Sequence, residues 1–247
     1  MRGSWPRVVE LAYWPTVQMI LWAFINQFLI GQSEWLAQVA GMFIGTVLLW
    51  DVLFRAQLGV SVVFFEEMYS RNLGHLFVSP LRPVELISSL LLISMMRTLI
   101  GVGTAAVLAI ILYHYSIFDM GLPLLVFFFN LMVTGWSIGI LVMALVLRYG
   151  LGAESLAWAV TFAIAPLAAV YYPVSVLPSW LQPVAMAIPA SHVFEGMRAL
   201  LIEHQFRVDL LLNAVLLNIL YMAVAMVVFL LSFHIARKHN LLLHIGE

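Results

Sequence analysis

The sequence contains no cysteine, and only 9% of its 247 residues are charged. The absence of cysteine excludes disulfide bonds, thiolate nucleophiles and metal sites built on cysteine. A soluble domain usually carries about 25% charged residues, so this chain has too little charge to cover a surface that faces water. Its formal net charge of -1 also lacks the basic excess that nucleic-acid binding requires. We therefore expect lipid as the main solvent and no nucleic-acid partner.

Motifs of catalysis are scarce as well. The chain has no HExxH helix and no GxxxxGK[ST] loop, and its only lysine is Lys238. The histidines are scattered without the spacing of metal ligands, so we expect no metal site. We find no pairing of a nucleophile with a base, which makes an intramembrane enzyme the weakest functional hypothesis. If ATP drives this protein, another chain must hydrolyse it.

Long apolar runs are what the chain has in place of charge, since hydrophobic residues make up 64% of it. A helix needs about 20 apolar residues to cross a hydrocarbon core of ~30 Å. Six stretches are long enough: 11–30, 37–62, 87–113, 122–147, 155–175 and 209–236. The gaps between them cannot hold a soluble domain, so we predict an all-α membrane protein with one transmembrane domain over 1–247. No small-residue cleavage site follows the first stretch, which we interpret as a retained helix.

Arginine and lysine gather on one side of the predicted spans. They precede the first span and follow the second, fourth and sixth, whereas the loops at 31–36 and 114–121 contain neither. The positive-inside rule therefore places both termini in the cytoplasm, with the chain in a cell (inner) membrane. Arg198 and Arg207 are exceptions, because they fall on the predicted outer side.

The predicted cytoplasmic segment after the second span is amphipathic. Leu73, Leu76 and Phe77 can share one face of a helix, while Arg71 and His75 point elsewhere. Two prolines then stop this helix before the third span begins. A short helix of this kind could dock onto another protein, or it could only hold the loop against lipid headgroups.

Four prolines interrupt the stretch before the last span: Pro173, Pro178, Pro183 and Pro189. A continuous helix cannot run through them, yet the stretch is too apolar for a solvated loop. Irregular backbone at membrane depth is tolerated only where protein or a watery cavity satisfies it. We therefore predict a re-entrant pair of short helices in this stretch.

These two segments resemble those of the ABC-2 type permeases, the membrane subunits of ATP-driven exporters. The resemblance rests on Ser79-Pro80-Leu81-Arg82 in the first segment, and on the proline spacing together with Glu195-Gly196-Met197-Arg198 in the second. It implies a coupling helix over 67–78 that presses into a groove on an ATPase subunit, with contact residues Glu66, Glu67, Arg71, His75, Leu76, Phe77, Pro80 and Arg82. It also implies an outer, re-entrant gate that carries Pro173, Pro178, Trp180, Pro183, Pro189 and Arg198.

Three charged residues fall inside predicted spans. Asp51 and Arg55 are four residues apart on the second span and can pair on one helical face, and Arg97 lies in the third span. Such charges cost about 2.5–3.5 kcal/mol each on insertion scales and usually face a bundle interior or water. They are candidates for a pathway or gate. The alternative is a structural ion pair, with Arg97 reaching toward the headgroups.

The hypothesis that accounts for most of these features is a permease subunit of an ATP-driven exporter that catalyses nothing itself. Two copies, as a homodimer, would face each other across the pathway, and ATP and Mg²⁺ would bind to a partner ATPase rather than to this chain. An ion- or proton-coupled carrier that uses Asp51, Arg55 and Arg97 is the alternative, although such carriers usually have more spans and helices broken at the midplane. Nothing in the sequence selects a drug, a lipid or a polysaccharide as the substrate.

Overall fold

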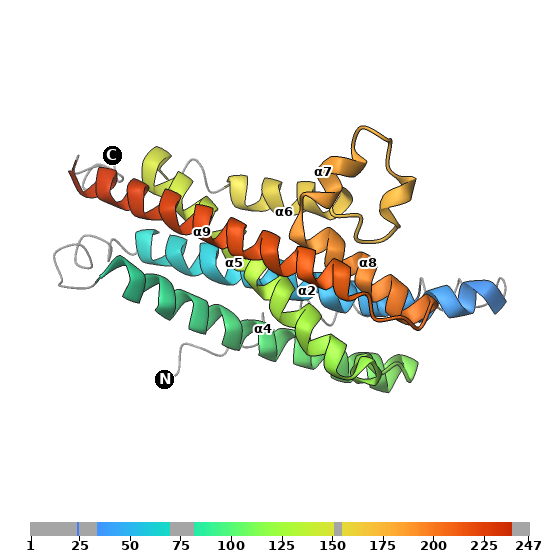
Figure 1. Ribbon diagram of the computed structural model, residues 1–247. Coiled ribbons are helices and arrows are strands. Elements are labelled where there is room, and N and C mark those ends of the chain that lie inside the picture. The colour runs from blue at the N-terminus through green and yellow to red at the C-terminus, as the bar shows by residue number, and fades with distance from the viewer. Residues whose placement is uncertain (1–23, 25–33, 70–81, 151–154, 239–247) are drawn as a thin grey trace.

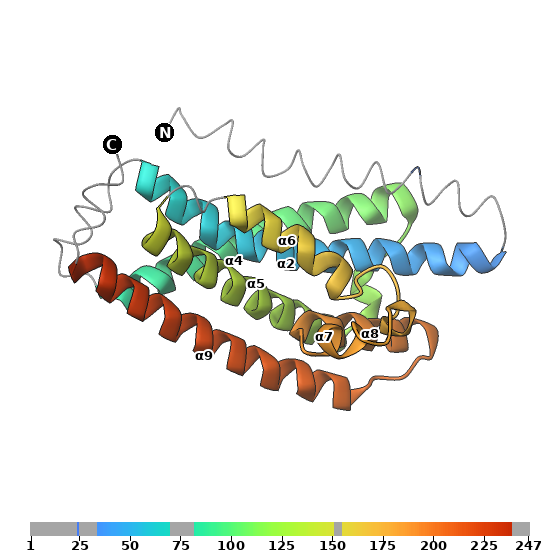
Figure 2. The ribbon, with the colours of Figure 1, turned by 90° about the horizontal axis from the view of Figure 1, so that it is seen from above.

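The computed structural model describes residues 24, 34–69, 82–150 and 155–238, and every regular element within these ranges is a helix (Figure 1). The longest are α2 (Glu34–Tyr69), α4 (Pro83–Tyr113), α5 (Leu122–Tyr149) and α9 (Val208–Lys238). Shorter helices are α6 (Ser155–Leu167), α7 (Gln182–Met186) and α8 (Pro189–Ile202), with the 3₁₀ turns η1 (Ile117–Met120) and η3 (Val174–Val176). The four long helices extend in the same general direction in both ribbon views (Figures 1 and 2).

Within the described residues, four helices are long and apolar enough to cross a membrane: Met42–Tyr69, Pro83–Leu112, Leu122–Tyr149 and Val208–Lys238. They match four of the six predicted spans. The predicted span at 11–30 lies outside the described residues, apart from Phe24, which is helical. The span predicted at 155–175 is longer than the helix found there, because α6 ends at Leu167. At 1.5 Å per residue α6 is about 20 Å long, which is less than the ~30 Å of a hydrocarbon core.

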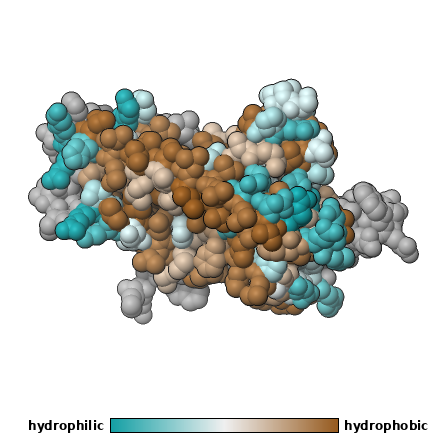
Figure 3. Space-filling view, viewed as in Figure 1, coloured by the Kyte–Doolittle hydropathy of each residue, from teal (hydrophilic) through white to brown (hydrophobic). Residues whose placement is uncertain are grey.

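Helices α2 and α5 form the centre of the bundle, and α4 and α9 lie at its outside. In the candidate spans, 78% of α2 is buried, against 22% of α9. The outer helices carry many exposed large apolar side chains, among them Met96, Ile111, Leu216, Ile219 and Leu231. On the face drawn in Figure 3, apolar surface covers the middle of the molecule and polar residues gather toward its ends. This arrangement is the one that suits lipid as the surrounding solvent.

Two glycines allow α5 to approach α2 closely. A Cβ atom on Gly135 would lie 2.6 Å from the carbonyl oxygen of Leu53, and one on Gly139 would lie 2.9 Å from that of Gln57. Four-residue spacing puts both glycines on one helical face, as in the GxxxG packing of membrane helices. The run 135–139 also matches the letters of the GxSxG nucleophile elbow, but that elbow requires a strand-to-helix turn. Here the run is in the middle of α5, and the Ser137 hydroxyl donates to the Val133 carbonyl at 2.8 Å.

The two ends of the bundle differ in charge. At one end α2, α5 and α9 finish and α4 begins (Figure 1), and it carries the exposed cations Arg82, Arg148, Arg237 and Lys238. We call it the basic end. At the opposite end are the turn η1 and the loop 203–207, together with the irregular stretch that follows α6.

Candidate functional site

Between α6 and α9 the chain folds into a compact irregular unit, residues 168–202, which we call the hairpin. It contains η3, α7 and α8, so the predicted interruption by prolines is present. Pro173 immediately precedes η3, Pro183 lies in the first turn of α7, and Pro189 begins α8. Proline is tolerated at these positions because the first N–H groups of a helix have no partner within it. Pro178 accepts a hydrogen bond from the Leu181 N–H at 2.8 Å and so closes the turn that carries the exposed Trp180.

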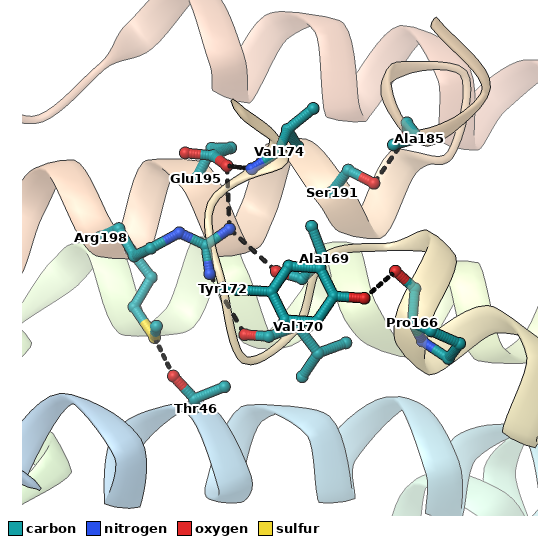
Figure 4. A network of polar contacts seen from close by, with 11 residues as sticks. Thr46, Pro166, Ala169, Val170, Tyr172, Val174, Ala185, Ser191, Glu195 and Arg198 are labelled. Carbon is teal, nitrogen blue, oxygen red and sulfur yellow. Dashed lines mark hydrogen bonds and ion pairs between the residues drawn. The ribbon is translucent and has the colours of Figure 1, made fainter. Parts of the chain in front are cut away.

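The buried Arg198 holds the first turn of the hairpin against α8 (Figure 4). Its guanidinium donates to the carbonyls of Ala169 at 3.0 Å and Val170 at 3.2 Å, and to the Glu195 carboxylate at 3.0 Å. The same oxygen of Glu195 accepts the backbone N–H of Val174 at 2.7 Å. We call these five residues the Arg198 cluster. A buried charge is costly unless it is paired and hydrogen-bonded, and this cluster supplies both conditions.

The Arg198 cluster explains why a cation stands at the end of the bundle that the sequence assigns to the outside. Arg198 is only 5% exposed, so it is a structural cation of the hairpin rather than a charge in a loop. It also accounts for an unusual backbone angle, because Ala169 has a φ of +50°. A left-handed conformation costs about 1–2 kcal/mol in a residue with a Cβ. The hydrogen bond from Arg198 to the Ala169 carbonyl offsets this cost.

Further contacts close the hairpin and join it to the long helices. The Tyr172 hydroxyl donates to the Pro166 carbonyl at 2.7 Å, and the Ser191 hydroxyl donates to the Ala185 carbonyl at 2.6 Å (Figure 4). On the side of α2, the Thr46 hydroxyl lies 4.0 Å from the sulfur of Met197. The hairpin is therefore an ordered part of the bundle, and α8 is its buried side.

The predicted pair of Asp51 and Arg55 is present on α2. Arg55 Nε lies 2.6 Å from Asp51 Oδ2, and both side chains are largely buried. The guanidinium extends toward α4, because a Cβ on Gly101 would lie 2.6 Å from Arg55 Nη1. Gly101 therefore makes room for the cation between the two helices.

Arg97 does not join this pair. It is half-buried on α4, and no ion pair connects it with another described residue. Both Arg55 and Arg97 lie roughly 21 Å along their helices from the basic end. Arg97 is therefore deeper than the sequence suggested, near the middle of α4. The two arginines share a depth, but among the described residues a carboxylate pairs with Arg55 and none with Arg97.

The predicted coupling residues are only partly within the described ranges. Glu66 and Glu67 are half-buried in the last turn of α2, and both take part in polar interactions. The backbone N–H of Arg82 donates to the Glu85 carboxylate at 2.9 Å, which caps the start of α4. The other predicted contacts lie outside the described residues; they are Arg71, His75, Leu76, Phe77 and Pro80.

The hairpin end also includes the half-buried side chain of a loop tyrosine, Tyr115. A Cβ on Gly45 would lie 2.6 Å from the hydroxyl oxygen of Tyr115, so the ring rests against α2. Burial, with the charge of Asp119, raises the pKa of Tyr115 to about 12. Tyr115 therefore stays a neutral hydroxyl at physiological pH, and its contact with α2 does not vary there.

Sequence reasoning missed two buried polar contacts between helices. The amide nitrogen of Gln57 on α2 donates to the Ala157 carbonyl of α6 at 2.8 Å, and its oxygen accepts the hydroxyl of Thr161. We call this the Gln57 contact. Between α5 and α9, Asn218 accepts the Thr134 hydroxyl at 2.8 Å and donates to the Asn130 side chain at 3.0 Å. The sequence does contain a signal for both contacts, namely an Asn or Gln side chain within an apolar span. Such residues commonly form hydrogen bonds between membrane helices.

Comparison with known proteins identifies the family of the chain. The family model for the ABC-2 type transporter matches residues 3–202, which is most of the chain. No curated protein sequence matches. Among the described residues, no group of three or more His, Asp or Glu side chains could hold a metal ion. Members of the matched family normally work with an ATPase subunit. The chain belongs to the ABC-2 type transporter family and is a permease, the membrane component of an ABC transporter.

Proposed function

We propose that this permease is half of an ATP-driven exporter, in which two copies face each other and each binds one ATPase subunit. The observation that carries the proposal is the ordered hairpin at the end of the bundle opposite to the basic end. Because the positive-inside rule assigns the basic end to the cytoplasm, the hairpin would face outward. A substrate that leaves the bilayer would pass the hairpin, which acts as the outer gate.

The packing of a single copy supports a pathway between two copies rather than through one. The centre of the described bundle is filled by side chains that are fully buried, including Leu48, Leu131 and Met143. A route through it would need to displace this core. The cores of folded proteins are packed as densely as crystals of small organic molecules. A surface shared by two copies avoids that cost. The filled centre therefore supports the proposal of a dimer.

ATP and Mg²⁺ would bind to the partner ATPase, and the segment 67–78 would contact that partner as a coupling helix. Closure of the ATPase pair would move this segment and so shift the permease between two states. Glu66, Glu67 and Arg82 stand at the two ends of the segment, next to the spans that receive the motion. The Asp51–Arg55 pair lies deeper in α2 than these residues and would keep α2 and α4 together during this motion.

The proposal is tested by copurification and ATPase activity. The permease is expressed together with a soluble chain that contains a Walker A motif, and the complex is reconstituted in vesicles. We expect Arg71→Glu and Arg82→Glu to abolish the stimulation of ATPase activity by the permease. Arg237→Glu is the matched control, because Arg237 is also an exposed cation of the basic end. If both charge-reversal variants still stimulate ATPase activity, the assignment of the coupling helix is contradicted. Transport driven by a proton gradient without ATP would favour the carrier instead.

A further inference from the structure

Helix α6, which leads into the hairpin, has few buried side chains. Among the side chains of α6 that the structure describes, only those of Ala157 and Thr161 are buried. The opposite side of the helix is exposed along its length, at Trp158, Phe162 and Pro166. Helix α6 does have apolar contacts, since Val160 and Ile164 pack against the core and the Trp158 ring lies 6.1 Å from the Phe54 ring of α2, but they are fewer than those of the long helices.

The two buried residues of α6 are those that bind Gln57. The Gln57 amide donates to the Ala157 carbonyl at 2.8 Å, and Thr161 donates to the amide oxygen. Gln57 itself is fully buried on α2. This contact therefore joins the N-terminal half of α6 to α2, about 18 Å along α2 from the basic end, through one side chain that both donates and accepts.

The other end of α6 is joined to α8 by the Arg198 cluster. The chain leaves α6 at Leu167, and the carbonyls of Ala169 and Val170 follow directly. Hydrogen bonds from an arginine are charge-assisted and are stronger than those between neutral groups. The Arg198 cluster also contains an ion pair with Glu195, which the Gln57 contact lacks. Of the two attachments, the one at Gln57 is the weaker.

The contact between α5 and α9 provides a contrast within the same chain. Asn130, Thr134 and Asn218 are all buried, and apolar side chains such as Phe229 are buried between helices on the same side. Here the polar contact is added to extensive packing. Loss of its hydrogen bonds would leave α5 and α9 together, whereas loss of the Gln57 contact would leave α6 with less packing on α2, including the contact of Trp158 with Phe54.

We propose that α6 is the moving helix of this permease, that it tilts about the Arg198 cluster, and that Gln57 holds it in the resting position. Because Ala169 and Val170 follow α6 directly, a tilt of α6 turns the first residues of the hairpin with it. Gln57 is thus a positioning residue for the outer gate. The inference rests on the proposed function of the hairpin, but its structural part concerns α2 and α6 alone.

Paired cysteines test the movement, because the chain has no cysteine of its own. Gln57→Cys with Thr161→Cys replaces a hydrogen-bonded pair between α2 and α6. Thr134→Cys with Asn218→Cys replaces a hydrogen-bonded pair between α5 and α9 and is the matched control. We expect oxidation of the first pair to lower ATP-driven transport by about tenfold, reversibly on reduction, because a conformational step then limits turnover. Oxidation of the second pair should leave transport within about twofold.

A second measurement needs neither transport nor the ATPase. A cysteine at Ala157 faces α2, and the rate at which a small thiol reagent modifies it reports the separation of α6 from α2. We expect Thr161→Val to raise this rate by about fivefold, since it removes one of the two hydrogen bonds that favour the resting position. Thr134→Val makes the same change at the other interface and should leave the rate unchanged.

The outcomes separate the inference from the proposed function. Full transport with the 57–161 disulfide formed overturns the moving helix, as does equal inhibition by both disulfides. If either disulfide fails to form, the labelling rates decide: equal rates in Thr161→Val and Thr134→Val overturn the role of Gln57. A permease that binds no ATPase but shows the expected difference in labelling contradicts only the proposed function.

Discussion

Buried arginines in this permease are held by partners from different parts of the chain. Arg55 binds a carboxylate one helical turn away, at 2.6 Å. Arg198 binds a carboxylate on its own helix and two carbonyls that precede it by 28 and 29 residues. Both arrangements pair a largely buried guanidinium with a carboxylate, although Arg198 Nε itself has no hydrogen-bond partner. They differ in consequence, because Arg55 fixes helix packing and Arg198 fixes the path of an irregular backbone.

Replacement of Arg198 tests the second arrangement. We expect Arg198→Met to lower the stability of the detergent-solubilised protein by about 3 kcal/mol, since Glu195 and two buried carbonyls lose their donor. Arg198→Lys should recover only part of this, because an ammonium lacks the planar fork that reaches several acceptors at once. Thermal unfolding measures both. Arg207→Met removes an exposed ion pair with Asp209 and is the control, with an expected change within about 1 kcal/mol. An equal loss at both arginines contradicts the cluster.

The Asp51–Arg55 pair predicts non-additive effects. Asp51→Asn or Arg55→Met alone leaves an unpaired charge in the membrane interior and should cost about 3 kcal/mol. The double variant leaves none, so it should be more stable than either single variant. A double-mutant cycle of thermal unfolding measures the coupling. Simple addition of the two single losses would show that the ion pair contributes little.

The sequence permitted prediction of the Asp51–Arg55 pair but not of the partners of Arg198. Spacing of four residues on a helix is a local rule, and it places Asp51 next to Arg55 without any tertiary information. The Ala169 and Val170 carbonyls belong to the backbone, which has the same groups at every residue. Only the fold shows which carbonyls α6 leaves without a helical partner. The contact between Gln57 and α6 was missed for the same reason.

At the scale of helices, the close approach of one helix to another depends on the position of glycine in them. Gly135 faces the backbone of α2, whereas nothing lies within 4 Å of a Cβ on Gly103 of α4. We expect Gly135→Ala to destabilise the protein by about 1–3 kcal/mol, because the added methyl meets a carbonyl that cannot move alone. Gly103→Ala should stay within about 1 kcal/mol of the parent or stabilise it, since alanine is the better helix former. Thermal unfolding of the two variants compares them, and equal losses would contradict the α2–α5 packing.

Long helices were predicted well from composition, and the end of α6 was not. Apolar runs identify α2, α4, α5 and α9 because each is bounded by polar residues or turns. The run that contains α6 continues through Ala168, Ala169 and Val170, so hydropathy gives no sign of its end. The helix ends there because the Arg198 cluster satisfies the carbonyls that follow. Apolar composition reports burial in lipid, and it does not report backbone conformation.

For the whole molecule, the charge difference between the two ends predicts the orientation in the membrane. Ser175 is exposed on the hairpin and Ser155 is exposed at the start of α6, on the side toward the basic end, so serine-to-cysteine changes place one small label on each side. In intact cells we expect an impermeant maleimide to modify Ser175→Cys and to modify Ser155→Cys only after permeabilisation. The parent chain has no thiol and gives no background. Labelling in the reverse order would place the hairpin in the cytoplasm and remove it as an outer gate.

The distance along the chain between Arg198 and its carbonyls also has a consequence for synthesis. The ribosome makes Ala169 and Val170 well before Arg198, 29 and 28 residues ahead. Until Arg198 emerges, these carbonyls have no donor from α8, and α6 is too short to cross the bilayer unaided. The nascent chain therefore cannot complete this region one helix at a time. We expect insertion of α6 to be completed only once α8 has been made and Arg198 can reach the Ala169 and Val170 carbonyls.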